Sequence, residues 1–418
     1  MKILYKIFSW YFRTLARIVL AIHHPQIVAI TGSVGKTTTK DVVRSLVASS
    51  RSVRATIRSQ NSELTTPLSI LGIEVQNKEL RILVWMGIII RAFWQLLSFS
   101  YPRVLILELG AGAPGDISSQ ARWIKPHIAV FTALARYPVH LEYFDSKQQL
   151  YDEKKSLALY TREDGVIVYP SDDIILARVL GSFSDRSIAI ASNEGSVRQL
   201  RFTPYGTEAQ IHHRGKWLPM RIPGVWSRPI INSYRLGLEV VSILGLDAEL
   251  AVDNFSRHYH PAPGRSRLLR GTRSSVIIDD SYNASPIAVQ AALEMFKQVE
   301  APARRIFLFG DMSELGEHTE ETHIQVGKQA SQIVDIFLTV GEEGKRACQA
   351  AQEAGMSNTQ AVCFDTAREA GAYLKREIKH RDYILAKGSR HAIHMEQALE
   401  QIIDPRDRQY LVQEYLNK

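Results

Sequence analysis

A glycine-bearing turn near the N-terminus carries the residues that are best suited to chemistry. Residues 31–38 read Thr-Gly-Ser-Val-Gly-Lys-Thr-Thr and follow a run of strand-forming apolar residues at 27–30. The two glycines let the backbone turn its N–H groups toward an anion, the lysine adds a positive charge, and a threonine hydroxyl can reach Mg²⁺. The pattern therefore predicts a phosphate-binding loop. We expect contacts from Gly32, Ser33, Val34, Gly35, Lys36, Thr37 and Thr38.

Two further side chains follow predicted strands and point to the same place. Residues 104–109 form an apolar strand that contains Glu108, and residues 128–132 form another that leads to His140. In a parallel α/β sheet, ligands bind outside the carboxyl ends of the strands. We therefore expect Glu108 to meet a metal ion at the loop, and His140 to act as a ligand or to orient a substrate.

The elements around these residues alternate between strands and helices. Apolar residues recur at helical spacing after the loop, and strands are predicted again at residues 274–278, 305–309, 336–340 and 383–386. This order favours two doubly wound α/β domains. After residue 278, Asp280 and Asn283 are polar enough to hold a ribose or an adenine edge, although a helix cap is the alternative. Arg265 can offer a fork of N–H groups to phosphate.

Composition narrows the class of protein. The chain has 418 residues, enough for two or three domains, with a formal net charge of +8 and a pI near 9.3. A basic balance suits anionic partners such as nucleotides or an acidic membrane surface. The two cysteines, Cys348 and Cys363, form no CxxC pair, which argues against a disulfide framework or a zinc site and fits a reducing cytoplasm.

The N-terminal residues 1–24 form a basic amphipathic pattern. On a helical projection, apolar residues from Leu4 to Ile22 share one face, and Lys2, Lys6, Arg13 and Arg17 lie opposite. Such a helix either lies flat on an anionic membrane or packs on the protein with its basic face in water. Residues 80–100 are a second apolar stretch, too short before Arg91 to span a bilayer, which forms a buried helix or an interfacial one.

Together the motifs resemble those of the Mur ligases, ATP-dependent enzymes that form amide bonds in peptidoglycan precursor synthesis. They are most similar to the branch that adds D-alanyl-D-alanine to a UDP-muramoyl tripeptide. The resemblance runs from about residue 27 nearly to the end of the chain. It is carried by residues 31–38, 61–63, 108–110, 140–142, 264–265, 279–286, 310–316 with His323, and 387–390.

The resemblance implies a role for each of these motifs. ATP and one or two Mg²⁺ ions are the expected cofactors, and the expected metal ligands are Thr37, Glu63, Glu108 and His140. Lys36, His140 and a carbamylated lysine, Lys154 or else Lys155, are the expected catalytic residues. Arg265, Asp280 and Asn283 would contact the nucleotide, and Asn61, Lys387 and Arg390 would contact the other substrates.

The implied architecture has two domains after the N-terminal helix. A P-loop-type doubly wound ATPase domain would occupy residues 25–262, and a Rossmann-like α/β domain residues 263–418. The implied partners are small molecules, namely a nucleotide-sugar peptide and a dipeptide or amino acid, with no nucleic acid. The protein would be a cytoplasmic monomer, with or without contact between residues 1–24 and the membrane.

Three departures from the family pattern bear on the substrate. The UDP-sugar-binding domain common in relatives has no counterpart in residues 1–24, Ala133 stands where an asparagine is expected, and Trp226 replaces a histidine. Two other functions therefore stay open. One is ligation to a different carboxylate acceptor, such as a lipid-linked wall precursor, a folate or a poly-amino acid. The other is an ATPase or switch without ligation.

Overall fold

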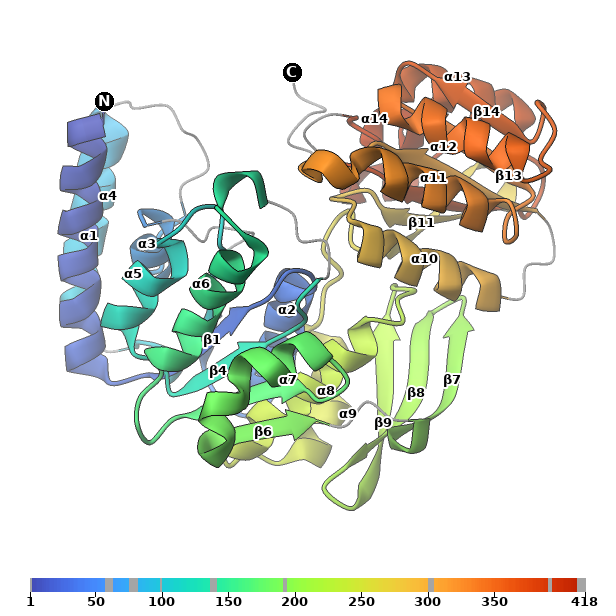
Figure 1. The fold of residues 1–418 in the computed structure, drawn as a ribbon. Helices are drawn as coiled ribbons and strands as arrows, with labels where there is room; N and C mark the ends of the chain where they lie inside the picture. The colour runs from blue at the N-terminus through green and yellow to red at the C-terminus, as the bar shows by residue number, and fades with distance from the viewer. Residues whose placement is uncertain are drawn as a thin grey trace.

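The computed structural model describes residues 2–56, 63–74, 82–97, 100–135, 141–190, 194–299, 304–389 and 393–411. The described residues form one parallel α/β sheet, one mostly parallel α/β sheet and one small antiparallel sheet (Figure 1). The first half of the chain builds one α/β unit, and the last third builds the other. This arrangement confirms the predicted fold class, a doubly wound central domain followed by a Rossmann-like one.

The first sheet is wholly parallel and has the order β2-β3-β1-β4-β5-β6. Its inner strands are nearly continuous apolar runs, as expected of a sheet that is covered on both faces. The strands are β1 (Gln26–Thr31), β2 (Val53–Ala55), β3 (Val104–Glu108), β4 (Ile128–Phe131), β5 (Val166–Pro170) and β6 (Ser187–Ile190).

Helices cover the two faces of this sheet because the side chains of a strand alternate between them. In β1, Val28 and Ile30 join the core beneath α2 (Lys36–Val47), α8 (Ile230–Ile243) and α9 (Ala248–His258). Ile27 and Ala29 face the opposite core. That core is covered by α1 (Lys2–His23), α3 (Thr65–Ile70), α5 (Asp116–Ile124), α6 (Lys147–Leu159) and α7 (Ile174–Leu180).

A small antiparallel sheet follows in the chain and extends the core beneath α2, α8 and α9. Its strands are β7 (Val197–Thr203), β8 (Gly206–His213) and β9 (Lys216–Pro223). Ile211, Met220 and Ile222 alternate along these strands and pack into the core that holds Val28. Short 3₁₀ helices join the elements at Gln95–Leu97 (η1), Leu141–Tyr143 (η2), Gly181–Arg186 (η3) and Glu194–Ser196 (η4).

The second α/β sheet has the order β10-β11-β15-β12-β13-β14, and only β10 runs antiparallel to its neighbour. Its strands are β10 (Arg267–Arg270), β11 (Val276–Asp280), β12 (Arg305–Gly310), β13 (Ile336–Val340), β14 (Ala361–Phe364) and β15 (Tyr383–Lys387). On one face lie α10 (Pro286–Gln298), α11 (Thr319–Ala330) and α12 (Glu342–Glu353). On the other lie α13 (Ala367–Glu377) and α14 (Glu396–Leu399). Further 3₁₀ turns are η5 (Thr272–Ser274), η6 (Gly316–His318) and η7 (Pro405–Tyr410).

Trp226 joins the small sheet to the second α/β sheet. Its indole N–H donates a hydrogen bond to the carbonyl oxygen of Thr203 at 2.7 Å. Its ring stacks on Tyr383 of β15, with 5.6 Å between the ring centroids. Trp226 is almost fully buried, so the residue that replaces the expected histidine serves here as a packing contact between the two halves of the chain.

The N-terminal helix α1 packs on the protein through α3, η1 and α4 (Ile82–Trp94). Phe12, Ala16 and Val19 are fully buried, and Leu15, which belongs to the apolar face of the helical projection, is buried as well. Lys6 and Arg17 are exposed. Part of the helix therefore fits the body-packing alternative. Within the described part of the chain, no helix has both the length and the apolar character that crossing a bilayer requires.

Candidate functional site

The phosphate loop, residues 32–38, is shaped by two glycines in conformations that other residues rarely adopt. Gly32 has a φ of 152°, and a Cβ atom there would lie 2.0 Å from the hydroxyl oxygen of Thr132. Gly35 has a φ of 81° and caps α2 without a side-chain hydrogen bond. The first backbone N–H groups of α2 consequently have no capping side chain, which is the arrangement that binds phosphate at helix N-termini.

The segment after β4 holds the loop in place. The backbone N–H of Ser33 donates to the carbonyl oxygen of Ala133 at 2.7 Å, and the N–H of Ala135 donates back to the Ser33 hydroxyl oxygen at 3.1 Å. These two bonds fix the loop against the neighbouring strand. Ala133, the departure from the family pattern, contributes through its backbone, so the change of side chain leaves this anchor intact.

Two lysines from distant elements meet on one carbonyl group of the loop. Lys36 Nζ and Lys154 Nζ donate to the carbonyl oxygen of Gly32 at 3.0 Å and 3.3 Å. Burial lowers the pKa of Lys36, with a smaller contribution from the charge of Arg265. Burial also lowers the pKa of Lys154, to about 7, and the charge of Lys36 acts in the same direction. The loop therefore gathers positive charge where a polyanion would sit.

The residues on either side of Lys154 in the sequence, Glu153 and Lys155, make contacts away from the phosphate loop. Glu153 Oε1 accepts hydrogen bonds from the N–H groups of Ile117 and Ser118 at 2.7 and 2.8 Å, so it caps the start of α5. Lys155 points its ammonium group over the ring of Phe183, 5.8 Å from the centroid. Of the two lysines considered as the carbamylated residue, only Lys154 reaches the phosphate loop.

Glu108 and Thr37 form an oxygen-rich pair beside the loop. The Thr37 hydroxyl donates to Glu108 Oε1 at 3.1 Å, and Lys40 Nζ lies 3.6 Å from Oε2. Glu108 is only 2 % exposed, and Oε2 accepts no hydrogen bond from the described residues. A buried carboxylate oxygen without a donor, next to a hydroxyl, fits Mg²⁺, which prefers oxygen ligands.

Of the other expected metal ligands, the structure describes Glu63 but not His140. Glu63 is exposed in the turn before α3, where its charge acts on Arg13 of α1. It shares no hydrogen bond or ion pair with Glu108 in the described structure. His140, like the expected substrate residues Asn61 and Arg390, lies outside the described residues. Within the residues that the structure does describe, no group of three or more His, Cys, Asp and Glu side chains is placed to bind a metal ion.

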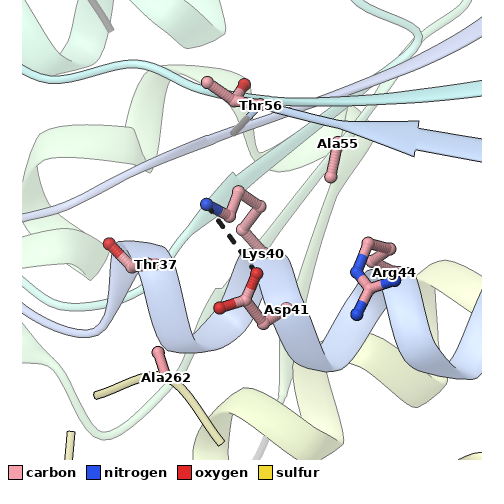
Figure 2. A pocket seen from close by; sticks show the side chains of 7 residues that line it. All are labelled: Thr37, Lys40, Asp41, Arg44, Ala55, Thr56 and Ala262. Atoms are coloured by element: carbon pink, nitrogen blue, oxygen red, sulfur yellow. Dashed lines mark ion pairs between the residues drawn. The ribbon is translucent and has the colours of Figure 1, made fainter. Parts of the chain in front are cut away.

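A pocket of about 280 Å³ opens beside Thr37 (Figure 2). Its lining residues are Thr37, Lys40, Asp41, Arg44, Ala55, Thr56 and Ala262. Burial raises the pKa of Asp41. Sequence reasoning missed Lys40, Asp41 and Arg44, although their spacing of three, four and seven residues from Thr37 puts them on one side of α2.

A second cluster lies where β11 and β15 end. Lys387 Nζ donates to Asp280 Oδ2 at 2.5 Å and to the carbonyl oxygen of Asn283 at 3.2 Å. The Arg265 guanidinium lies over the Tyr282 ring, 3.9 Å from its centroid. The structure thus groups Lys387, expected to bind the amine substrate, with residues expected to bind the nucleotide. The positive charge of Arg265 also lowers the pKa of Lys36, so Arg265 lies near the phosphate loop.

Asp279 ties the chain between the two α/β units to β11. It is fully buried and accepts hydrogen bonds from the N–H of Gly264 at 3.1 Å and from Ser281. Burial raises its pKa to about 6. Gly264 has a φ of 69°, and a Cβ there would lie 2.8 Å from the backbone nitrogen of Tyr282. This contact positions the neighbouring Arg265.

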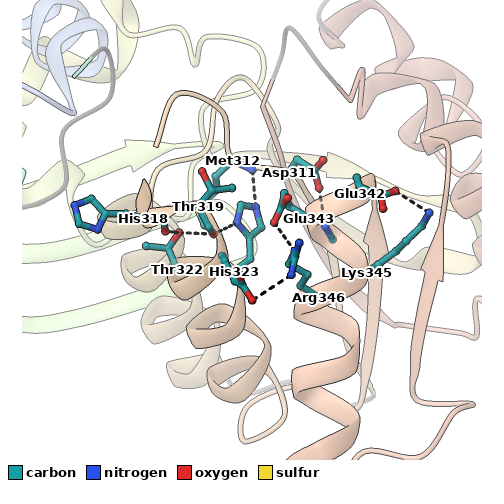
Figure 3. A network of polar contacts seen from close by, with 12 residues as sticks. Asp311, Met312, His318, Thr319, Thr322, His323, Glu342, Glu343, Lys345 and Arg346 are labelled. Carbon is teal, nitrogen blue, oxygen red and sulfur yellow. Dashed lines mark hydrogen bonds and ion pairs between the residues drawn. The ribbon is translucent and has the colours of Figure 1, made fainter. Parts of the chain in front are cut away.

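His323, part of the motif that begins at Gly310, is a structural residue. Its Nε2 accepts from the N–H of Met312 at 3.0 Å, and its Nδ1 lies 2.6 Å from the carbonyl oxygen of Thr319, to which it donates (Figure 3). Burial lowers the pKa of His323. A neutral ring with both nitrogens occupied holds the loop after β12 and leaves no position for a metal or a substrate.

Comparison with known proteins agrees with this geometry. Residues 92–225 match the Mur ligase middle domain, and residues 264–390 match the Mur ligase glutamate ligase domain. The chain is 23 % identical to UDP-N-acetylmuramoyl-tripeptide--D-alanyl-D-alanine ligase of Bacillus subtilis (strain 168), over 91 % of this chain and 76 % of that protein. It is 26 % identical to the protein of the same name from Mycobacterium tuberculosis (strain CDC 1551 / Oshkosh), over 87 % and 70 %.

Solved structures show the same fold. The MurF ligase from Thermotoga maritima in complex with ADP superposes with a TM-score of 0.75 and 24 % identity, covering 94 % of this chain and 83 % of that one. The first domain match lies on the sheet that carries the phosphate loop, and the second on the sheet that carries Asp280 and Lys387. The protein therefore belongs to the Mur ligase family, of which it has the middle and C-terminal domains.

Proposed function

We propose that this protein is an ATP-dependent ligase that joins D-alanyl-D-alanine to the peptide carboxyl group of UDP-N-acetylmuramoyl-tripeptide. The family and the names of the relatives supply the reaction. The observation that carries it to this chain is the convergence of Lys36 and Lys154 on the Gly32 carbonyl beside the Thr37–Glu108 pair. This arrangement suits the transfer of a phosphoryl group from ATP.

The reaction has two steps, and the residues of the loop serve the first. A carboxylate oxygen of the acceptor attacks the γ-phosphorus of ATP, which gives an acyl-phosphate and ADP. Residues 32–38 and Lys36 hold the phosphates and offset the charge that develops during transfer. Thr37 and Glu108 would hold Mg²⁺, with His140 as a further expected ligand, and the ion would neutralise phosphate charge. The amine then attacks the acyl carbon, loses a proton and displaces phosphate.

We propose that Lys154 is carbamylated. A neutral amine attacks CO₂ and releases a proton, so the reaction needs a lysine that is deprotonated near neutral pH. The lowered pKa of Lys154, about 7, meets this need, and its position next to Lys36 would place the new anion beside a cation. The carbamate would add an oxygen ligand for a second Mg²⁺, close to the loop.

The C-terminal unit would complete the nucleotide site and bind the amine. We assign Arg265, Asp280 and Asn283 to the nucleotide, and Lys387 with Arg390 and Asn61 to the other substrates. The Asp279–Gly264 bond supports a domain boundary near residue 263, between units at 25–262 and 263–418. Closure of the second unit over the first would exclude water from the acyl-phosphate, which otherwise hydrolyses.

We also propose that the enzyme works in the cytoplasm as a monomer and that residues 1–24 make a peripheral contact with the inner face of the membrane. The basic and apolar composition of these residues supports this contact. The proposed substrates are small molecules, and no nucleic acid takes part in the proposed reaction.

Mass spectrometry of reaction products tests the assignment. Purified protein is incubated with ATP, Mg²⁺, UDP-N-acetylmuramoyl-tripeptide and D-alanyl-D-alanine, and we expect a product heavier by one dipeptide less water. Lys36→Ala should reduce product formation by about a hundredfold or more, because it removes a charge that stabilises the transition state. Release of phosphate at a rate indifferent to the dipeptide, without product, would identify an ATPase instead.

A further inference from the structure

Two helices at one edge of the molecule leave large apolar side chains exposed. α1 and α4 are in contact and stand next to each other in Figure 1. Trp10 is 67 % exposed and Trp94 is 63 % exposed. We call the group the α1/α4 surface. Its members are Ile7, Trp10, Ile18 and Ile22 of α1 and Ile90, Phe93 and Trp94 of α4.

The exposed side chains of α1 form a stripe that the core does not use. Positions 7, 10, 18 and 22 fall on one side of a helix with 3.6 residues per turn. Phe12, Ala16 and Val19 point to the other side and are fully buried against the body of the protein. α4 repeats this division, since Ala92 is buried whereas Trp94 is exposed. Both helices are therefore apolar on the packed side and again on the outer side.

The charged residues of the two helices themselves have a single sign. Neither α1 nor α4 contains an aspartate or a glutamate. Lys6 and Arg17 of α1 and Arg91 of α4 are exposed on the same two helices. Apolar and tryptophan side chains together with cations are the combination that binds the interface of an anionic bilayer, where rings enter the headgroup layer and cations meet lipid phosphates.

A second copy of the chain is a poorer occupant of the same surface. In a two-fold interface each molecule presents the same patch, so Lys6, Arg17 and Arg91 of one copy would approach those of the other. Bringing like charges together in a partly desolvated interface costs free energy. Anionic lipid removes this cost because its headgroups carry the opposite charge.

We propose that the α1/α4 surface docks on an anionic lipid bilayer, with both helices lying along the membrane plane. The inference rests on the proposed peripheral contact of residues 1–24 and deepens it in two ways. It assigns the contact to the stripe of Ile7, Trp10, Ile18 and Ile22, and it adds α4 as the second half of the surface. The phosphate loop lies on a separate part of the fold and stays open to soluble substrates.

Vesicle flotation tests this surface with the full chain. Vesicles of phosphatidylcholine with about 30 % phosphatidylglycerol are compared with pure phosphatidylcholine. We expect wild-type protein to float with the anionic vesicles, and the double variant Trp10→Gln, Trp94→Gln to lose about tenfold or more of its partitioning, because two interfacial anchors are removed. Replacing Lys6, Arg17 and Arg91 by glutamine should weaken binding to anionic vesicles and lower its dependence on salt.

Matched controls keep the outcomes distinct. Ile174 and Tyr205 are also highly exposed but lie in α7 and in the turn between β7 and β8, so Ile174→Gln, Tyr205→Gln should float like wild type. Ligation measured without vesicles should be unchanged in all three variants, which separates this test from that of the proposed activity. If wild type does not float, both the contact and the surface are wrong. If the tryptophan variant still floats, or if the same substitutions only dissolve a dimer, the α1/α4 surface is not a lipid-docking site.

Discussion

At the scale of single residues, the site depends on charged groups that the fold has removed from water. Lys154 is 4 % exposed and Glu108 is 2 % exposed, and each has a partner on the phosphate loop. Burial lowers the pKa of the lysine, whereas the carboxylate keeps one oxygen without a hydrogen-bond donor. Both features are costly in a protein interior unless a ligand uses them.

The protonation of Lys154 predicts how carbamylation depends on pH. With a pKa of about 7, the amine is mostly protonated at about pH 6 and mostly neutral at about pH 8. We expect the carbamate signal in ¹³C NMR spectra, recorded with labelled bicarbonate, to grow over this range. Lys154→Ala should lose the signal and most of the ligation activity. Lys155→Ala is the control and should retain both, and a signal that follows Lys155 instead would contradict the assignment.

At the scale of elements, the turn between β1 and α2 is the most constrained part of the site. Gly32→Ala would drive a methyl group into Thr132 and impose an unfavourable backbone conformation. We expect ATP affinity to fall by about tenfold or more, measured by calorimetry, because the N–H groups of the loop would be displaced. Gly181→Ala is the control, since a Cβ there meets open space. Equal ATP affinity of the two variants would show that the loop tolerates the side chain.

The turn after β11 should make stability depend on pH. The Asp279 carboxyl has a pKa of about 6 in the folded protein and a lower one, about 3.8, when unfolded. The folded state therefore binds more protons between these values, and the stability that Asp279 contributes is lost as the pH rises through about 6. The loss is on the order of 3 kcal/mol at most. Asp279→Asn should reduce the fall in unfolding free energy between about pH 4 and pH 7, measured by urea denaturation, and an unchanged fall would contradict this origin.

At the scale of the whole molecule, the site is divided between two α/β units. The phosphate loop belongs to the first sheet and Arg265 precedes the second, yet the charge of Arg265 reaches Lys36. A nucleotide held by both would link the units and favour a closed arrangement. Such closure brings the amine to the acyl-phosphate and keeps water out.

Limited proteolysis tests this link. A non-hydrolysable ATP analogue with Mg²⁺ should slow cleavage between α9 and β10 several-fold, because ligand binding lowers the population of open states. Arg265→Ala should lose this protection while the phosphate loop still binds the analogue. Arg257→Ala, in the exposed last turn of α9, is the matched control. Protection that survives in Arg265→Ala would indicate that Arg265 does not link the two units.

Local sequence patterns predict the phosphate loop and the two α/β sheets of this protein. Glycine spacing and the preceding apolar run predict the phosphate loop, because only glycine adopts the backbone angles found at residues 32 and 35. Strand and helix periodicity predict two doubly wound sheets, which the structure confirms. The position of Glu108 beside the phosphate loop could be predicted as well, since the carboxyl ends of neighbouring parallel strands meet at one edge of a sheet.

Tertiary structure decided the rest, because it depends on contacts between residues far apart in the chain. Only the packing of α6 against β1 brings Lys154 to the Gly32 carbonyl and lowers its pKa. Only the β11–β15 pairing joins Lys387 to Asp280. The helical projection of residues 1–24 gave an amphipathic helix but could not say whether its apolar face packs on the protein or on a membrane, because both surroundings favour the same pattern. The packing of α1 on α3, η1 and α4 buries Phe12 and Val19 and leaves Trp10 exposed.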